Sequence, residues 1–257
     1  MLILGIDLEG MNENLVESGV NLQVDRVTEI GAVLWDTRIN SPIRIFSELV
    51  DERDRIPMTE EVIELTGIDD KLLKDHGLKT DEIKLALERL AILIKKADYL
   101  MAHNGEKYDK PMLTAMYKRY SLEIPTKTWI DTQNDIEYPR KITHKSMAAL
   151  EHAHGFINPF PHRAVTDVLS MLKIASHYDY ARMATIASGP KIKIVASLKA
   201  PNWKDKNQVE DFNKIKNKVA RARFQWDPEN KQWFKIVPKL HIDEGILNFD
   251  FDWSTRV

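Results

Sequence analysis

Residues 2–10, LILGIDLEG, place two acidic side chains within an apolar run that has the composition of a buried strand. Asp7 and Glu9 are two residues apart, so on a strand both carboxylates leave one face while Ile6 and Leu8 point into the opposite packing layer. Crowded anions raise a carboxyl pKa or destabilise the fold unless a cation lies between them, and a hard divalent cation is the usual partner. The pattern therefore indicates either a metal site or an acidic, solvated strand end.

The order of the remaining elements is typical of a mixed sheet. Short apolar runs predict further strands at residues 28–36, 43–50, 98–104 and 128–132. Helical spacing of apolar residues predicts helices at residues 81–97, 110–122, 146–155 and 164–178. Asp81 and Ser146 are expected caps, Gly155 a terminator, and Pro111 the beginning of its helix. Because strands come first and helices then alternate with strands, we expect an α/β fold with helices flanking a mixed sheet.

A domain boundary is expected at Gly189-Pro190, where the charge balance also changes. Residues 191–240 hold 13 Lys and Arg against 5 Asp and Glu, whereas residues 1–190 hold 23 against 30. Beyond the boundary the pattern predicts a strand at 191–201, a basic helix at 207–222, two strands within 223–238, and an alternating strand at 245–253. We therefore expect one domain over residues 1–188 and a small basic α+β domain over residues 191–257.

Composition excludes several classes of site. The chain has no cysteine, which rules out disulfides, thiolate zinc sites and a cysteine nucleophile, and it favours a reducing, cytoplasmic setting. The first apolar run ends after six residues at Asp7, and no later run approaches membrane-spanning length. We expect a soluble protein that does not enter a membrane.

Three further residues have side chains suited to chemistry. Asp109 follows a predicted strand and precedes a helix, and taken alone an Asp in this place is better explained as a cap of that helix. His162 lies in a proline-rich loop, and Asp167 follows about one and a half turns into the next helix if that helix begins near Arg163. Taken separately, a loop histidine and a surface aspartate account for this pair equally well.

Taken together, these residues resemble the DEDDh exonucleases, the family of polymerase proofreading subunits, ribonuclease T and oligoribonuclease. IDLEG, AHNGEKYD and HRAVTD look like the three family motifs in order, and TEIGAVLWD, ELTGI and WIDT look like the intervening signatures. The resemblance covers about residues 1–180. It implies a ribonuclease H-like fold with a five-stranded mixed sheet and a 3′-to-5′ exonuclease that releases nucleoside 5′-monophosphates.

The resemblance also implies the parts of the active site. Two Mg²⁺ or Mn²⁺ ions are expected on Asp7, Glu9, Asp109 and Asp167, with His162 as general base on a mobile loop. The expected substrate is nucleic acid with a free 3′ end, and single-stranded DNA is favoured over RNA and over duplexes. An exoribonuclease shares every one of these residues, and a non-catalytic nucleic-acid-binding protein would be expected to lack one or more of them.

The sequence departs from common family members beside these motifs. Gly10 and Met11 follow Glu9 where small hydroxyl residues are frequent, Tyr108 stands where Phe is frequent, and residues 12–26 form a longer segment than usual. In relatives the backbone and side chains just after the motif contact the terminal nucleotide. Gly10 and Met11 are therefore expected contacts, and Asn104 is a candidate for touching a sugar.

The small domain resembles compact modules with a Trp-Asp-Pro hairpin that are appended to nucleic-acid enzymes. Its basic and aromatic side chains are candidates for binding phosphates and stacking on bases, namely Lys214, Lys216, Lys218, Arg221, Arg223, Trp226 and Trp233. They are equally explained as a solvated face and a small core. The tail at 245–253 is interpreted as a strand, while a replication or recombination partner that binds the small domain or the tail stays open. The size of the chain suits a stand-alone nuclease of the kind carried by phages.

Overall fold

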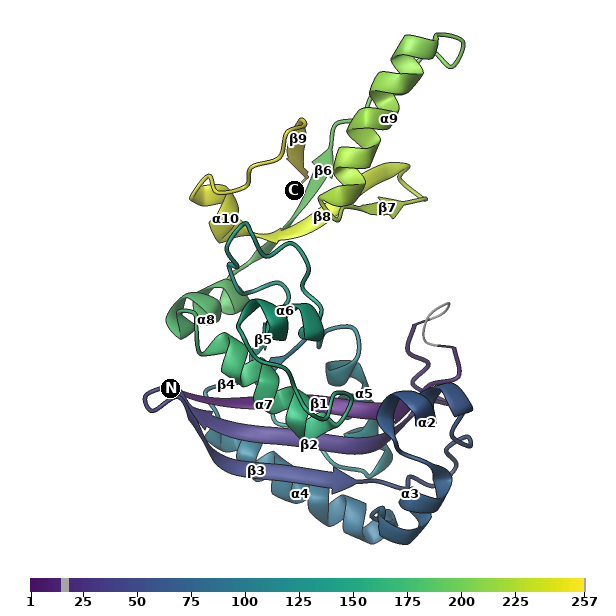
Figure 1. Ribbon diagram of the computed structural model, residues 1–257, viewed down its shortest axis with the longest axis vertical. Helices are drawn as coiled ribbons and strands as arrows, with labels where there is room; N and C mark the ends of the chain where they lie inside the picture. Colours follow the sequence, from purple (N-terminus) through teal and green to yellow (C-terminus); the bar gives the residue numbers. More distant parts are fainter. Residues whose placement is uncertain (15–18, 257) are drawn as a thin grey trace. The chain divides into compact units, whose positions relative to one another are not determined.

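β1 (Leu2–Met11) is the central strand of a five-stranded mixed sheet in the order β3-β2-β1-β4-β5 (Figure 1). It pairs antiparallel with β2 and parallel with β4. The remaining strands are β2 (Arg26–Asp36), β3 (Ser41–Leu49), β4 (Tyr99–Ala102) and β5 (Trp129–Asp131). The computed structural model describes residues 1–14 and 19–256, and it divides into two compact units, Met1–Ala187 and Ser188–Val257. The predicted five-stranded mixed sheet with flanking helices is confirmed.

Helices cover both faces of this sheet, as the alternation of β1 requires. Leu4, Ile6 and Leu8 pack with α4 (Thr80–Lys96) and α5 (Asp109–Arg119). On the other face, Ile3 packs with α7 (Ala164–Ala175) and α8 (Tyr180–Ser188). Because side chains alternate along a strand, Asp7 and Glu9 lie on the α7 face, the same face as Ile3.

Several predicted helix ends are wrong by one or two residues. Lys79, not Asp81, is the N-cap of α4, and its amide donates to the Glu82 carboxylate at 2.9 Å. α5 begins at Asp109, one residue before the predicted range. α6 (Met147–Ala153) follows Ser146 as predicted. The short helices α2 (Glu60–Thr66) and α3 (Asp70–His76) were not predicted, because seven residues carry too little periodicity to be distinguished from a loop.

The second unit is a four-stranded antiparallel sheet with one long helix. The strand order is β7-β8-β6-β9. Its elements are β6 (Lys191–Ala196), α9 (Lys206–Arg221), β7 (Gln225–Asp227), β8 (Gln232–Pro238), α10 (Lys239–Asp243) and β9 (Trp253–Arg256). A small core of Ile194, Val219, Phe224 and Val237 joins the helix to the sheet. The unit is an α+β structure, as predicted.

The tail differs from the predicted strand over residues 245–253. Strand β9 begins only at Trp253, because β6 offers Lys193–Ala196 as its pairing edge. The alternation nevertheless reports burial, since Phe249, Phe251 and Trp253 all pack against the small core. Side chains that hold the unit together in this way are not displayed as an acidic-aromatic peptide for a protein partner.

No helix in the described part of the chain combines the length and the apolar composition needed to cross a bilayer.

Candidate active site

The α7 face of β1 is built so that a helix can approach the sheet beside Asp7. Asp7 is paired with Gly31 of β2, and a Cβ at Gly31 would lie 2.3 Å from the carbonyl carbon of Ala164. Gly5 likewise faces Val168, whose Cγ1 would lie 2.7 Å from an added Cβ. Small residues on both strands therefore let the first turn of α7 settle onto the sheet, next to the carboxylates of β1.

Asp109 reaches the same place from the other side of β1. Strand β4 pairs with β1 only along Ile3, Leu4 and Gly5, so the amide of Leu8 lies beyond the shorter strand. That amide donates to Asp109 Oδ1 at 3.0 Å. Asp109 is the first residue of α5, and Tyr108 is the N-cap, so the alternative reading of Asp109 as a helix cap is wrong. The buried Asp109 carboxylate therefore joins α5 to β1, the strand that carries Asp7 and Glu9.

His162 and Asp167 are joined at the beginning of α7. Asp167 is the fourth residue of this helix, about one turn in rather than one and a half. The amide of His162 donates to Asp167 Oδ2 at 3.1 Å, and the exposed His162 has a left-handed φ of 59°. One potential ligand atom from each of Glu9, His162 and Asp167 lies within 4.8 Å of the others. Segments 150 residues apart in the sequence thus meet at one point.

The four acidic side chains are costly to ionise together. Burial raises the pKa of Asp7 well above its usual range, and repulsion from Asp109, Glu9 and Asp167 adds to the effect. Burial followed by the charge of Asp167 raises the pKa of Glu9 to about 8, against a smaller lowering by Arg163. Burial also raises the pKa of Asp109 to about 7 and that of Asp167 to about 6. The arrangement favours a positive charge between the carboxylates.

Glu29 and Arg163 are two parts of this site that the sequence did not single out. Glu29 lies opposite Glu9 across the β1–β2 pairing and is 1% exposed. Arg163 Nη2 donates to its Oε1 at 2.8 Å, and the amide of Ala164 donates to its Oε2 at 2.9 Å. The Glu29 carboxylate therefore holds the first turn of α7 on the sheet. An acidic residue within the apolar run TEIGAVLW was the available signal.

The residues that follow Glu9 occupy different surroundings. Gly10 has room for no side chain, because a Cβ there would lie 2.6 Å from Tyr108 Oη, which donates to Asn12 Oδ1 at 2.9 Å. Met11 is 2% exposed and packs in the core, and its contact with nucleic acid stays a prediction. Asn104 is partly exposed at φ 64°, and its amide donates to Asp131 Oδ1. Residues 15–18 of the long segment lie outside the described residues.

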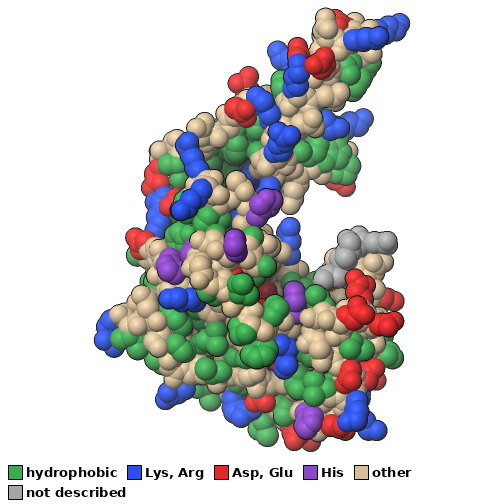
Figure 2. All heavy atoms as spheres, viewed as in Figure 1, with side chains coloured by type: hydrophobic (Ala, Val, Ile, Leu, Met, Phe, Trp, Pro, Cys, Tyr) green, Lys and Arg blue, Asp and Glu red, His purple; other side chains and the backbone are tan. Residues whose placement is uncertain are grey.

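The predicted contact residues of the second unit divide into paired and exposed groups. Lys214 is paired with Glu210 at 3.0 Å and Lys218 with Asp250 at 2.8 Å. Lysines, arginines and acidic side chains are interspersed along α9 (Figure 2). Trp233 packs against the core, while Trp226, 5.7 Å from it between ring centres, is 49% exposed. Lys216, Arg221 and Arg223 are exposed.

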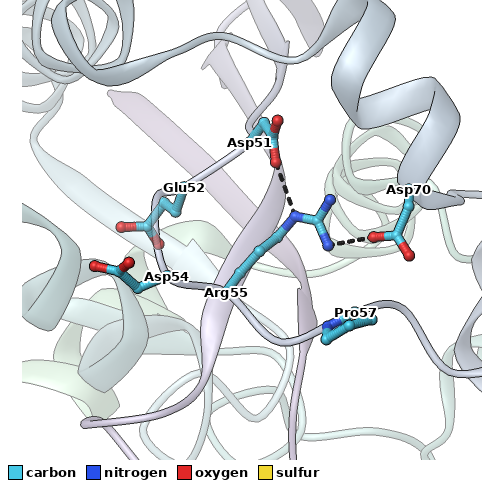
Figure 3. Close-up of a pocket in the computed structure, with 6 residues that line it drawn as sticks. All are labelled: Asp51, Glu52, Asp54, Arg55, Pro57 and Asp70. Atoms are coloured by element: carbon cyan, nitrogen blue, oxygen red, sulfur yellow. Dashed lines mark hydrogen bonds and ion pairs between the residues drawn. The ribbon is translucent and has the colours of Figure 1, made fainter.

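A separate acidic pocket of about 340 Å³ does not belong to this site (Figure 3). Arg55 lies between Asp51 and Asp70 and pairs with both. Glu52 is buried and receives two donations from Arg119, at 2.9 and 2.6 Å. Three of the pocket's four carboxylates, those of Asp51, Glu52 and Asp70, therefore have cationic partners within the protein.

Comparison with known proteins agrees with this geometry. The family model described as RNase_T, Exonuclease, matches residues 6–175, a range that contains Asp7, Glu9, Asp109, His162 and Asp167. No curated protein matches the chain.

Solved structures share the fold at low sequence identity. The nuclease domain of 3′hExo, a DEDDh family member bound to rAMP, is 20% identical, with a TM-score of 0.54 over 68% of this chain and 90% of that one. Exonuclease I of E. coli with a dA16 oligonucleotide is 13% identical, with a TM-score of 0.58 over 76% of this chain and 48% of that one. Its zinc-bound form matches equally. The chain thus spans about half of Exonuclease I, and it belongs to the RNase_T exonuclease family.

Proposed function

We propose that the chain hydrolyses nucleic acid by a two-metal mechanism and releases nucleoside 5′-monophosphates from the 3′ end. Asp7, Glu9, Asp109 and Asp167 are the proposed ligands of two Mg²⁺ or Mn²⁺ ions, and His162 is the proposed general base. The observation that carries the proposal is the convergence of Glu9, His162 and Asp167, with ligand atoms within 4.8 Å, where two more carboxylates raise the cost of negative charge.

The donor set fits hard divalent cations. All four side chains offer carboxylate oxygens, the ligands that Mg²⁺ and Mn²⁺ prefer. Arg163 is the nearby cation that lowers the pKa of Glu9, and its guanidinium is already committed to Glu29. When bound, the cations would stabilise charge on the attacking and departing oxygens of the phosphodiester. Asp7 and Glu9 would hold them from β1, while Asp109 and Asp167 would hold them from α5 and α7.

His162 is suited to remove the proton from the attacking water. An imidazole has an ordinary pKa near 6.5, which matches proton transfer around neutral pH. Its side chain is exposed while its amide is anchored to Asp167, so the ring can turn toward the water without losing its place beside the carboxylates. One ring nitrogen would accept the proton and later release it to solvent.

DNA is the proposed substrate ahead of RNA. Structures of this fold are known with either nucleic acid, since Exonuclease I is solved with a DNA oligonucleotide and the 3′hExo nuclease domain with rAMP. The second unit is proposed to hold the strand through exposed Lys216, Arg221 and Arg223, with Trp226 available to stack on a base. An exoribonuclease is the alternative and would act through the same carboxylates.

The proposal is tested by trimming of 5′-labelled oligonucleotides. Single-stranded DNA should give a ladder that shortens from the 3′ end with Mg²⁺ or Mn²⁺, and EDTA or Asp7→Asn should stop it. Asp36→Asn is the matched control, because this acid pairs with Arg38 and lies opposite Leu2, at the far end of β1 from Asp7, so its loss should leave the rate unchanged. Matched RNA should be trimmed more slowly, and faster trimming of RNA would favour the exoribonuclease.

The same assay separates catalysis from binding alone. A non-catalytic nucleic-acid-binding protein would retain the oligonucleotide in a gel shift without any metal-dependent shortening. Trimming that persists in Asp7→Asn would contradict the assignment of the carboxylates.

A further inference from the structure

The loop that carries His162 contains one buried polar side chain between exposed apolar ones. Asn158 is 5% exposed, whereas Ile157 and Phe160 on either side of it are 78% and 64% exposed. A buried amide in a surface loop is stable only when its donors and acceptors are satisfied. The partners of Asn158 therefore show what holds the loop.

Each polar end of Asn158 has a defined partner. Its amide nitrogen Nδ2 donates to Asp167 Oδ1 at 2.5 Å, and its Oδ1 accepts from the amide of Phe160 at 3.0 Å. The backbone amide of Asn158 donates to Glu151 Oε2 at 3.1 Å, and Glu151 is itself only 5% exposed. The orientation of the side-chain amide is unambiguous, because the Phe160 amide can only donate and a carboxylate prefers a donor.

These contacts place Asn158 between the proposed metal ligand and the proposed base. Asp167 receives Asn158 Nδ2 on Oδ1 and the His162 amide on Oδ2, so both oxygens are oriented by the same loop. Each oxygen accepts one donor here and keeps a second lone pair for a cation. Thr166 closes the loop from the helix side, where its hydroxyl donates to the Phe160 carbonyl at 2.5 Å.

Besides the contacts of Asn158, two prolines restrict the backbone of this loop. Pro159 and Pro161 fix two φ angles between Asn158 and His162, and His162 itself has φ 59°. Few backbone angles are therefore left free between the Phe160 amide and His162. Release of the Phe160 amide from Asn158 would therefore displace His162 as well as free the Asp167 carboxylate.

We propose that Asn158 is a positioning residue that couples the Asp167 metal ligand to His162, orienting the carboxylate and holding the loop of the base with one side chain. The proposal rests on the proposed function, in which Asp167 holds a cation and His162 moves a proton. Partners that orient metal ligands typically change metal affinity by ~10- to 100-fold when they are removed. The coupling predicts that both metal binding and the rate respond to one substitution.

The test uses Asn158→Ser, whose side chain is too short to reach Asp167, and Asn158→Ala, which removes both side-chain contacts. Mn²⁺ binding is measured by calorimetry without substrate, and the single-turnover rate at saturating Mn²⁺ is measured with 5′-labelled DNA. We expect Mn²⁺ affinity to fall about 10-fold or more and the rate to fall by a similar factor. Ile157→Ala, on the adjacent exposed side chain, should change neither quantity.

A double-mutant cycle with His162→Ala separates positioning from a loss of folded protein. If Asn158 acts through His162, Asn158→Ser should slow the His162→Ala enzyme far less than the wild type, at an unchanged unfolding midpoint. Fully additive rate losses with wild-type Mn²⁺ affinity would overturn the coupling. A wild type that binds no Mn²⁺ and trims nothing would instead refute the proposed function itself.

Discussion

Burial, together with four other acidic side chains, raises the cost of a charge on the Asp7 carboxylate. Such crowding destabilises the metal-free protein and is the property that would let the site capture cations. The sequence revealed these residues, because Asp7 and Glu9 interrupt an apolar run and the motifs follow in order. It did not reveal Glu29, Arg163 or Asn158, because they act through partners that lie far away in the sequence or across a loop.

Glu9→Gln should stabilise the metal-free protein at high pH. The folded-state pKa of Glu9 is about 8 against an ordinary 4.5, so the folded state binds the extra proton and stability falls as pH rises through that window. The variant has no such proton to lose. Thermal unfolding in EDTA at pH 8 should show a midpoint at least ~2 °C above wild type, and the gain should vanish near pH 4.5. A lower midpoint than wild type at pH 8 would contradict the electrostatic account.

His162→Ala should slow chemistry more than it weakens metal binding. Loss of a general base typically costs ~10²- to 10⁴-fold in rate. Mn²⁺ affinity, measured by calorimetry, should fall less than about 10-fold if the carboxylates are the ligands. His162 does lie within ligand distance of Glu9 and Asp167, so equal losses of rate and affinity would identify it as a metal ligand instead.

Among the elements, β1 and α7 meet at the site because Gly5 of β1 and Gly31 of β2 let the helix approach the sheet closely. Strong signals made β1, β2, α4, α7 and α9 predictable, since each has a long run of one periodicity. The strand predicted over residues 245–253 was mostly wrong, because aromatic alternation indicates which side chains are buried and not whether the backbone pairs with a neighbouring strand. The helix ends were misplaced because capping depends on local hydrogen bonds such as the one between Lys79 and Glu82.

Gly31→Ala tests the close approach of α7 to the sheet. The added Cβ would lie 2.3 Å from the Ala164 carbonyl carbon and 2.4 Å from the Val165 nitrogen, both backbone atoms that cannot move without the helix. We expect a loss of ~1–3 kcal/mol in the free energy of unfolding, measured with urea, and a lower trimming rate because α7 carries Asp167. Wild-type stability and activity together would show that α7 does not depend on this contact.

At the scale of the whole molecule, the chain separates a unit with the carboxylate site from a smaller unit with exposed basic side chains. The break at residues 187–188 lies one residue before the predicted Gly189-Pro190 boundary, where both composition and charge change. Binding of the nucleic-acid strand by the second unit remains a prediction, since aromatic residues in so small a core pack inward whatever the function.

Joint substitution of Lys216, Arg221 and Arg223 by alanine should weaken substrate binding without altering the chemical step. Each phosphate contact contributes ~0.7 to the slope of log affinity against log salt for a single strand, so the slope of log KM should fall by about 2. The kcat should remain at the wild-type value. Lys214→Ala is the matched control, because that lysine is paired with Glu210 and should contribute little. An unchanged KM and salt slope would remove the second unit from substrate binding.

The most direct test of the account is the product formed when single-stranded DNA is cleaved with Mn²⁺ in ¹⁸O-labelled water. Attack of water on the phosphodiester at the 3′-terminal nucleotide should release nucleoside 5′-monophosphates that carry one ¹⁸O on the phosphate by mass spectrometry, in order from the 3′ end. Neither Asp7→Asn nor EDTA-treated protein should release any. Nucleoside 3′-monophosphates, release from the 5′ end, or labelled product from Asp7→Asn would contradict the central claim that these carboxylates form the site of a 3′-to-5′ exonuclease.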